Sequence, residues 1–143
     1  MSRPYVDQSF LRLTIALALL VVLSGCGREK TVPVSGTVTL DGEPIGPGTI
    51  IFTPTTEGAL SAMGSFGTDG RYQLSTFDPN DGAVLGSHRV IIQASSSSES
   101  EFGDEEIIDS NIPLLYADPQ QSGLTAEVIP GSGPIDFDLH DDS

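Results

Sequence analysis

Hydrophobic and polar residues alternate in short stretches after residue 33, and this alternation is typical of half-buried strands. In VSGTVTL, residues 34–40, apolar residues or glycine occupy every second position, and serine or threonine fills the positions between. A period of two places successive side chains on opposite faces of a sheet. The same criteria predict seven strands, which cover residues 34–40, 50–54, 60–68, 71–76, 87–94, 124–128 and 135–139.

Two of these segments indicate which side chains should point into the core. The side chains expected to face inward are Val90, Ile92, Ala94, Ile135, Phe137 and Leu139. Those expected to face outward are Arg89, Ile91, Asp136 and Asp138. The predicted domain therefore has one apolar interior and a polar surface.

Turn residues separate the predicted strands. Asp69-Gly70 lies between the third and fourth strands, and Asp-Gly is typical of a type I′ turn, in which both central residues have positive φ. We therefore expect residues 60–68 and 71–76 to form a hairpin. Short strands at intervals of about ten residues, with no helical period between them, predict an all-β fold, a seven-stranded antiparallel β-sandwich.

An acidic insertion separates the fifth and sixth predicted strands. Residues 95–111, SSSSESEFGDEEIIDSN, contain six acidic residues and no basic one. This composition predicts a mobile, solvated loop. The apolar residues after it are expected to fold back over an open end of the sandwich. They are Ile112, Leu114, Leu115 and Tyr116.

The first 25 residues have the layout of a secretory signal peptide. Arg3 and Arg12 precede the apolar stretch LTIALALLVVL at 13–23, and small residues follow it. A helix that crosses a bilayer needs about 20 apolar residues, so the sequence favours export over a permanent span. An amphipathic core helix would carry a polar stripe, and no such stripe interrupts 13–23.

Cys26 is the only cysteine of the chain. It can form no internal disulfide, and nothing in the sequence places a base beside it for a catalytic thiolate. The residues LSGC at 23–26 resemble the lipobox of bacterial lipoproteins. The resemblance implies cleavage before Cys26 and lipidation of its sulfur and its new amine. Two or three acyl chains hold a protein on a membrane, whereas one chain binds only marginally.

The lipobox divides the chain into a signal peptide at 1–25, a lipidated tether at 26–33, a β-domain at 34–140 and a tail at 141–143. The tether after Cys26 can span at most about 25 Å, so we expect the domain to lie close to its membrane, outside the cytoplasm. Gly27 stands where some bacteria use an aspartate to retain lipoproteins at the inner membrane. Its presence favours the outer membrane over the inner one.

The charge of the chain argues against a nucleic-acid partner. The full chain carries a net charge of −14, and a chain starting at Cys26 keeps four basic and 19 acidic residues, for a net charge of −15. Binding a phosphate backbone depends on clustered Lys and Arg, which this sequence lacks. The expected partners are the membrane, through the lipid, and an unidentified protein or glycan.

The sequence offers no catalytic set. His88 and His140 are the only histidines, and a zinc hydrolase needs more ligands than these two can supply. We expect His88 to lie on the surface or rim of its strand, and His140 to lie in a frayed tail. The serines at 95–98 lack a nucleophile elbow. We therefore predict no catalytic residue and no enzymatic activity.

Calcium is the remaining chemical candidate, and no other cofactor is expected beyond the lipid on Cys26. Oxygen ligands could come from Asp78, Asn80 and Asp81 in FDPNDG. A second group consists of Glu99, Glu101, Asp104, Glu105 and Glu106. The first group lacks the downstream glutamate of an EF-hand, and such residues also make turns or solvated faces.

Four segments resemble a known family. They are VSGTVTLDGEPIGPGTIIFTP, TDGRYQLST, GAVLGSHRVII and IPLLYADPQQSGLTAEVIPGSGPIDFDL, spread over residues 34–139. Together they look like small bacterial lipoproteins with a carboxypeptidase regulatory-like domain, a branch of the transthyretin-like or prealbumin-like sandwiches. The resemblance implies a prealbumin-like, Ig-like sandwich. It implies no activity, because one fold hosts unrelated functions.

The sequence therefore predicts a membrane-anchored, non-enzymatic lipoprotein of the cell envelope. Its β-sandwich is expected to be a binding or structural module for an unknown ligand. The alternative is a calcium-dependent adhesion module or a carbohydrate-binding module.

Overall fold

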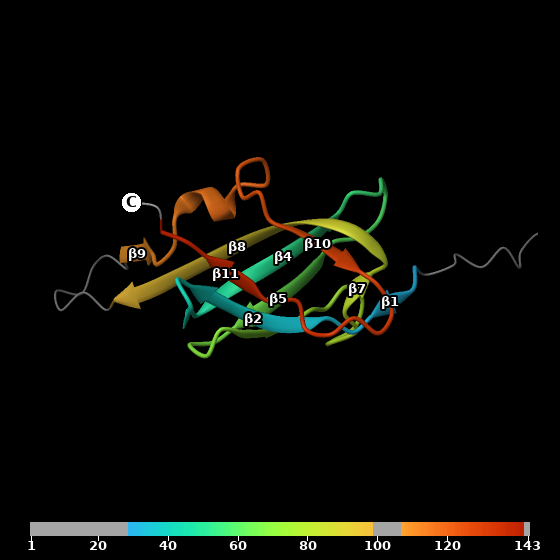
Figure 1. Cartoon of the computed structure of the whole chain (residues 1–143), viewed down its shortest axis with the longest axis horizontal. Helices are drawn as coiled ribbons and strands as arrows, with labels where there is room; N and C mark the ends of the chain where they lie inside the picture. The colour runs from blue at the N-terminus through green and yellow to red at the C-terminus, as the bar shows by residue number, and fades with distance from the viewer. Residues whose placement is uncertain (1–28, 99–106, 142–143) are drawn as a thin grey trace, which may run out of the picture.

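The computed structural model describes residues 29–98 and 107–141 and contains strands and one short 3-10 helix (Figure 1). The elements are β1 (Thr31–Val32), β2 (Ser35–Leu40), β3 (Glu43–Pro44), β4 (Gly48–Pro54), β5 (Ala62–Phe66), β6 (Arg71–Gln73), β7 (Ala83–Val84), β8 (Gly86–Ser98), β9 (Ile107–Ser110), η2 (Leu114–Ala117), β10 (Thr125–Val128) and β11 (Phe137–Leu139). The fold is all-β, as predicted.

One curled sheet organises the domain. Its strands follow the order β10-β8-β4-β5-β6-β2-β11, while β3 pairs with β2 and β9 pairs with β8. A separate two-stranded sheet joins β1 to β7. Each of the seven segments predicted to be strands overlaps one strand of the main path, and β4 and β8 extend beyond their predicted bounds.

The last strand does not follow the antiparallel prediction. β11 runs parallel to β2, with Phe137 opposite Val38 and Leu139 opposite Leu40. The backbone N–H of Ile135 donates to the Ser35 carbonyl at 2.9 Å, just before this pairing begins. The prediction was wrong here because the connection after β10 brings the chain to the start of β2, so that β11 follows this edge in the same direction as β2.

The curl brings distant strands together around one core. Phe52 of β4 is fully buried, and its ring centroid lies 5.9 Å from that of Phe137 of β11. It also lies 6.3 Å from the ring of Tyr72 of β6. Because β4 and β11 are four positions apart in the sheet, this contact crosses the interior. The sheet therefore folds back over its own apolar face.

The alternation in the sequence assigned the faces correctly. Residues 90, 92 and 94 of β8 are buried, whereas Arg89 is exposed and Ile91 is half-buried. In β11, Phe137 and Leu139 are buried, whereas Asp138 and the preceding Asp136 are exposed. Ile135 is half-buried and packs against the core.

The hairpin at Asp69-Gly70 forms, but its turn differs from the prediction. Phe66 pairs with Tyr72, and the N–H of Gly70 donates to the Gly67 carbonyl at 3.0 Å. Gly70 has φ +69°, whereas Asp69 is not among the residues with positive φ. The turn is therefore one residue longer than a type I′ turn. The expected Asp-Gly turn conformation, with positive φ at both residues, occurs instead at Asp41-Gly42. Their φ values are 51° and 83°, and the flanking residues Leu40 and Glu43 pair.

The acidic insertion contains more structure than its composition predicted. β8 extends through Ser98 and pairs with β9, Ser95 opposite Ser110 and Ser98 opposite Ile107. Backbone pairing between strands does not require apolar side chains, so a polar composition did not exclude it. Of the residues expected to cover an open end, Ile112 is buried and Tyr116 packs against the core. Leu114 and Leu115 remain exposed, contrary to that prediction.

A short strand, β1, lies within the segment predicted to be a tether. Thr31 pairs with Val84 and Val32 with Ala83. Gly82 allows the close approach, because it has φ +89° and a Cβ there would lie 1.7 Å from the Val32 carbonyl oxygen. The signal peptide, Cys26, the acidic residues at 99–106 and the tail residues 142–143 lie outside the described residues. In 29–98 and 107–141 no helix has the length and apolarity to cross a membrane.

Candidate functional site

An open groove of about 920 Å³ lies on the outer face of β2, β5 and β6, and its lining combines polar side chains with the apolar Met63 and Pro134. Alternation explains its lining, since Gly36, Gly64 and Tyr72 are buried and their strand neighbours point outward. Most of these neighbours carry side chains that form hydrogen bonds, and so does Asp136 in the connection between β10 and β11. They are Ser35, Thr37, Ser65, Arg71, Gln73 and Asp136.

The pairing of β2 with β6 sets the spacing of the groove. Thr37 is opposite Arg71 and Ser35 is opposite Gln73. On the far side of β2, the N–H of Thr37 donates to Asp136 Oδ1 at 2.8 Å. Arg71 of β6 and Asp136, just before β11, therefore lie on opposite sides of Thr37.

Arg71 is the only lysine or arginine in the groove lining. Within the described part of the chain it forms no ion pair. The lining contains no histidine or cysteine. This arrangement can donate and accept hydrogen bonds and can attract one anionic group, which suits binding of a hydroxyl-rich or carboxylate-bearing ligand.

Sequence reasoning did not find this groove. The alternating pattern of each strand did predict that these serine, threonine, arginine and glutamine side chains face outward. Their convergence depends on β6 lying between β5 and β2, and that order involves long-range pairing.

The calcium candidates at 78–81 form a turn. Asp81 accepts hydrogen bonds from the N–H of Thr76 at 2.7 Å and of Phe77 at 3.1 Å, one on each carboxylate oxygen. Asn80 has φ +60°, and its N–H donates to Ser75 Oγ at 2.8 Å. The carbonyl of Asp78 accepts from the N–H of Asp81 at 3.2 Å. Across 29–98 and 107–141, no group of three His, Cys, Asp or Glu side chains could hold a metal ion.

His88 lies in the core, so the prediction of a surface or rim position was wrong. It is 1% exposed, and its ring lies 5.8 Å from the Phe52 ring. Nδ1 is 2.9 Å from the Gly86 carbonyl oxygen, whereas Nε2 is buried without a partner. His88 shares the parity of Val90 and the buried residues after it. That parity was the available signal.

Burial lowers the pKa of His88 below its ordinary value. The Gly86 carbonyl and the negative charge of Glu127 oppose this shift but are weaker than desolvation. A proton on Nε2 would be buried without an acceptor. His88 is therefore a neutral core residue, with Nδ1 as the donor to Gly86.

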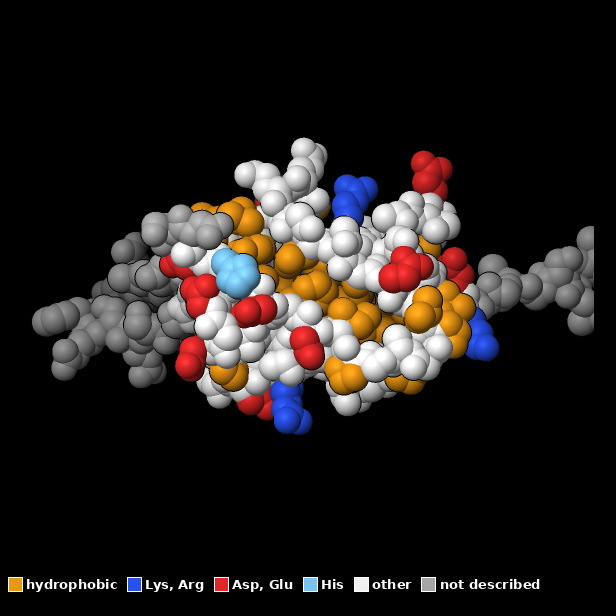
Figure 2. Space-filling model, viewed as in Figure 1, with side chains coloured by type: hydrophobic (Ala, Val, Ile, Leu, Met, Phe, Trp, Pro, Cys, Tyr) orange, Lys and Arg blue, Asp and Glu red, His pale blue; other side chains and the backbone are white. Residues whose placement is uncertain are grey.

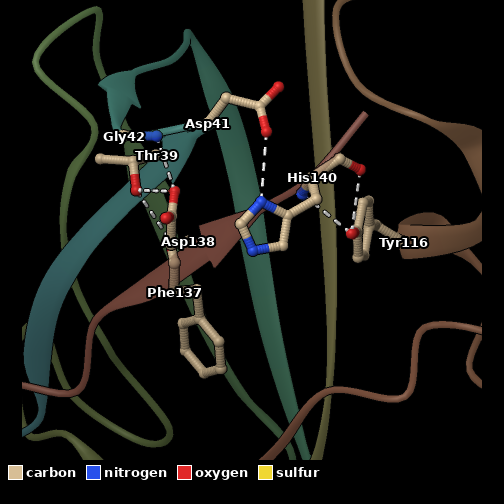
Figure 3. A network of polar contacts seen from close by, with 7 residues as sticks. All are labelled: Thr39, Asp41, Gly42, Tyr116, Phe137, Asp138 and His140. Atoms are coloured by element: carbon tan, nitrogen blue, oxygen red, sulfur yellow. Dashed lines mark hydrogen bonds and ion pairs between the residues drawn. The ribbon is translucent and has the colours of Figure 1, made fainter. Parts of the chain in front are cut away.

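A second polar network joins the C-terminal strand to two other elements (Figure 3). The N–H of His140 donates to Tyr116 Oη at 3.0 Å, and Tyr116 Oη lies 3.2 Å from the His140 carbonyl, to which it donates. His140 Nδ1 lies 3.2 Å from Asp41 Oδ1. The backbone is thus fixed through residue 140, contrary to the expected fraying.

Asp138 completes this network on the β2 side (Figure 3). Its Oδ1 accepts from Thr39 Oγ1 at 2.7 Å and from the N–H of Gly42 at 2.9 Å. These two hydrogen bonds lower the pKa of Asp138, the Thr39 hydroxyl most strongly. The network joins β11 to the β2–β3 turn, so its role is structural.

Comparisons with known proteins identify no family. No protein-family model matches the chain, and no curated protein matches it. Among solved structures, the chain is similar to a 9R-lipoxygenase from Cyanothece PCC8801 at 12% identity and a TM-score of 0.34. The alignment covers 92% of this chain and 22% of the lipoxygenase. A similarity of this size supports no conclusion about activity.

Proposed function

We propose that the protein is a non-enzymatic lipoprotein of the cell envelope, anchored through lipid on Cys26, whose β-domain is a binding module. The observation that carries this proposal is the short distance along the chain between LSGC at 23–26 and β1 at Thr31. A lipobox followed almost at once by a folded domain is the arrangement of a membrane-held module. The outer membrane is favoured over the inner one by Gly27.

The domain is proposed to be a prealbumin-like β-sandwich of the carboxypeptidase regulatory-like kind. Two observations support this assignment. The main sheet path contains the expected number of strands, and Phe52 packs against Phe137 across the interior, as residues of two facing layers do.

Replacing Cys26 with alanine is expected to abolish lipid attachment and cleavage before residue 26. The mature chain from native membranes should begin at Cys26 and carry the added mass of a diacylglycerol and an acyl chain. The Cys26→Ala chain should keep residues 1–25 and lose that mass, because the modified sulfur is absent. Intact-mass spectrometry of the membrane fraction measures both. A wild-type chain recovered with its signal peptide and without lipid would refute the anchor.

A carbohydrate-binding module is the second candidate, and the groove of β2, β5 and β6 favours it. Hydroxyl, amide and guanidinium groups line this groove, and such groups bind sugar hydroxyls and carboxylates through hydrogen bonds. Calcium-dependent adhesion has no comparable support from Asp78, Asn80 and Asp81, since both carboxylate oxygens of Asp81 accept backbone N–H groups.

Replacing Arg71 with alanine is expected to weaken binding of galacturonic acid, a sugar with one carboxylate, at least about tenfold, because a hydrogen bond to a charged group contributes roughly 1.5–3 kcal/mol. Isothermal titration against galacturonic acid and the neutral galactose measures the effect. Arg89→Ala is the matched control, since Arg89 is also an exposed arginine on a strand but lies outside the groove. Equal losses in the two variants would contradict binding in the groove.

A further inference from the structure

Exposed apolar side chains gather at the end of the domain where the chain emerges from β1. Leu85 is 43% exposed and Ile129 is 52% exposed. Gly86 pairs with Val128, so these two residues are the next ones beyond the same end of β8 and β10. Leu60, 54% exposed, lies in the connection between β4 and β5 at that end. Figure 2 shows apolar side chains at this end of the molecule beside a basic one.

The anchor and the apolar end are joined by a short stretch of chain. Thr31 pairs with Val84, the residue before Leu85. Five residues of chain lead from Cys26 to Thr31, and they can span at most about 18 Å when fully extended. Leu85 follows the residue that pairs with Thr31, and Ile129 lies at the same strand end. If Cys26 is lipidated, these two exposed apolar side chains therefore lie close to the membrane attachment point.

Charges at this end do not favour a purely electrostatic contact. Lys30 is exposed immediately before β1. Three acidic residues are also exposed at this end. Glu29 precedes β1, Glu57 lies in the connection after β4, and Glu127 is on β10. Attraction of Lys30 to anionic headgroups is thus offset by neighbouring carboxylates. What this end offers a membrane is apolar surface, which the lipid anchor would hold at high local concentration.

We propose that the β1 end of the domain rests on the lipid surface, with Leu85 and Ile129 inserted among the headgroups. This proposal rests on the proposed lipid anchor. It sets the orientation of the domain, with the β2–β3 turn pointing away from the membrane. The partner is the interfacial region of a bilayer.

The test uses the processed, lipidated chain in vesicles of phosphatidylethanolamine and phosphatidylglycerol. Gly133→Cys places a nitroxide in the loop after Ile129, where a Cβ meets open space. Glu43→Cys places one in the exposed β2–β3 hairpin. Collision of each label with oxygen and with a polar nickel complex reports its depth. We expect the residue-133 label at headgroup depth and the residue-43 label in water.

The double variant Leu85→Ser and Ile129→Ser should still float with the vesicles, while its residue-133 label becomes as aqueous as the label at residue 43. The matched control is Leu114→Ser with Leu115→Ser, which removes two exposed leucines of η2 and should leave the depth unchanged. Co-flotation with an aqueous residue-133 label in the unmutated domain would overturn this proposal alone. Failure to float would overturn the anchor and this proposal together. The depth of the label in the unmutated domain decides the question even if the double variant fails to fold.

Discussion

Replacing Phe52 with alanine is expected to lower the free energy of unfolding of the domain by about 3–5 kcal/mol. The ring is fully buried and contacts the rings of Tyr72, His88 and Phe137. Its removal leaves a cavity between β4 and β11 that the surrounding strands cannot close, because each is fixed by its own sheet neighbours. The loss approaches the total stability of many small domains.

Urea denaturation followed by circular dichroism measures this effect as a fall in the midpoint at an unchanged slope. Leu114→Ala is the control, since Leu114 is 75% exposed and its truncation should change the stability by less than about 0.5 kcal/mol. Similar midpoints for the two variants would show that the interior contact between Phe52 and Phe137 is not formed.

The stability of the domain is expected to fall with pH below about 6.5 through His88. The unfolded chain binds a proton at the ordinary histidine pKa of about 6.5. The folded chain resists that proton because burial lowers the pKa of His88. Between the two values the unfolded state holds the extra proton, so acid favours unfolding by up to about 1.4 kcal/mol per pH unit. The contribution of His88 is complete above the unfolded value.

His88→Leu should remove this component of the pH dependence, since leucine fills the apolar site and binds no proton. The measurement is the difference in unfolding free energy between the parent and the variant from pH 7.5 to 5. His140→Asn is the control, because His140 is exposed and its replacement should retain the His88 component. A parent and a His88→Leu variant with parallel profiles would disprove the assignment.

The local alternation of the sequence predicted where strands lie and which side chains face the core. It could not predict which strands pair with one another. Alternation in 87–94 predicted the burial of Val90 correctly, and the same parity applied to His88 would have placed that ring in the core. A polar residue next to an arginine was instead assigned to the surface by its chemistry. The two-residue period predicts burial better here than the polarity of the residue does, because a strand in one register buries every second side chain.

The groove and the parallel position of β11 depend on which strands become neighbours. Thr37 contacts Asp136 across 99 residues of sequence, and Ser35 meets Gln73 through a strand pairing. No local pattern contains such distances. The lipobox prediction is the opposite case, because it rests on four consecutive residues.

The parallel pairing of β2 with β11 also sets how the domain would bear force. β2 begins on the side of β1, and β11 ends where Tyr116 contacts His140. A pull between the start of β2 and a load attached near residue 140 would slide these strands along each other. In that geometry their hydrogen bonds must break together instead of one by one, so the pairing resists tension as a single unit.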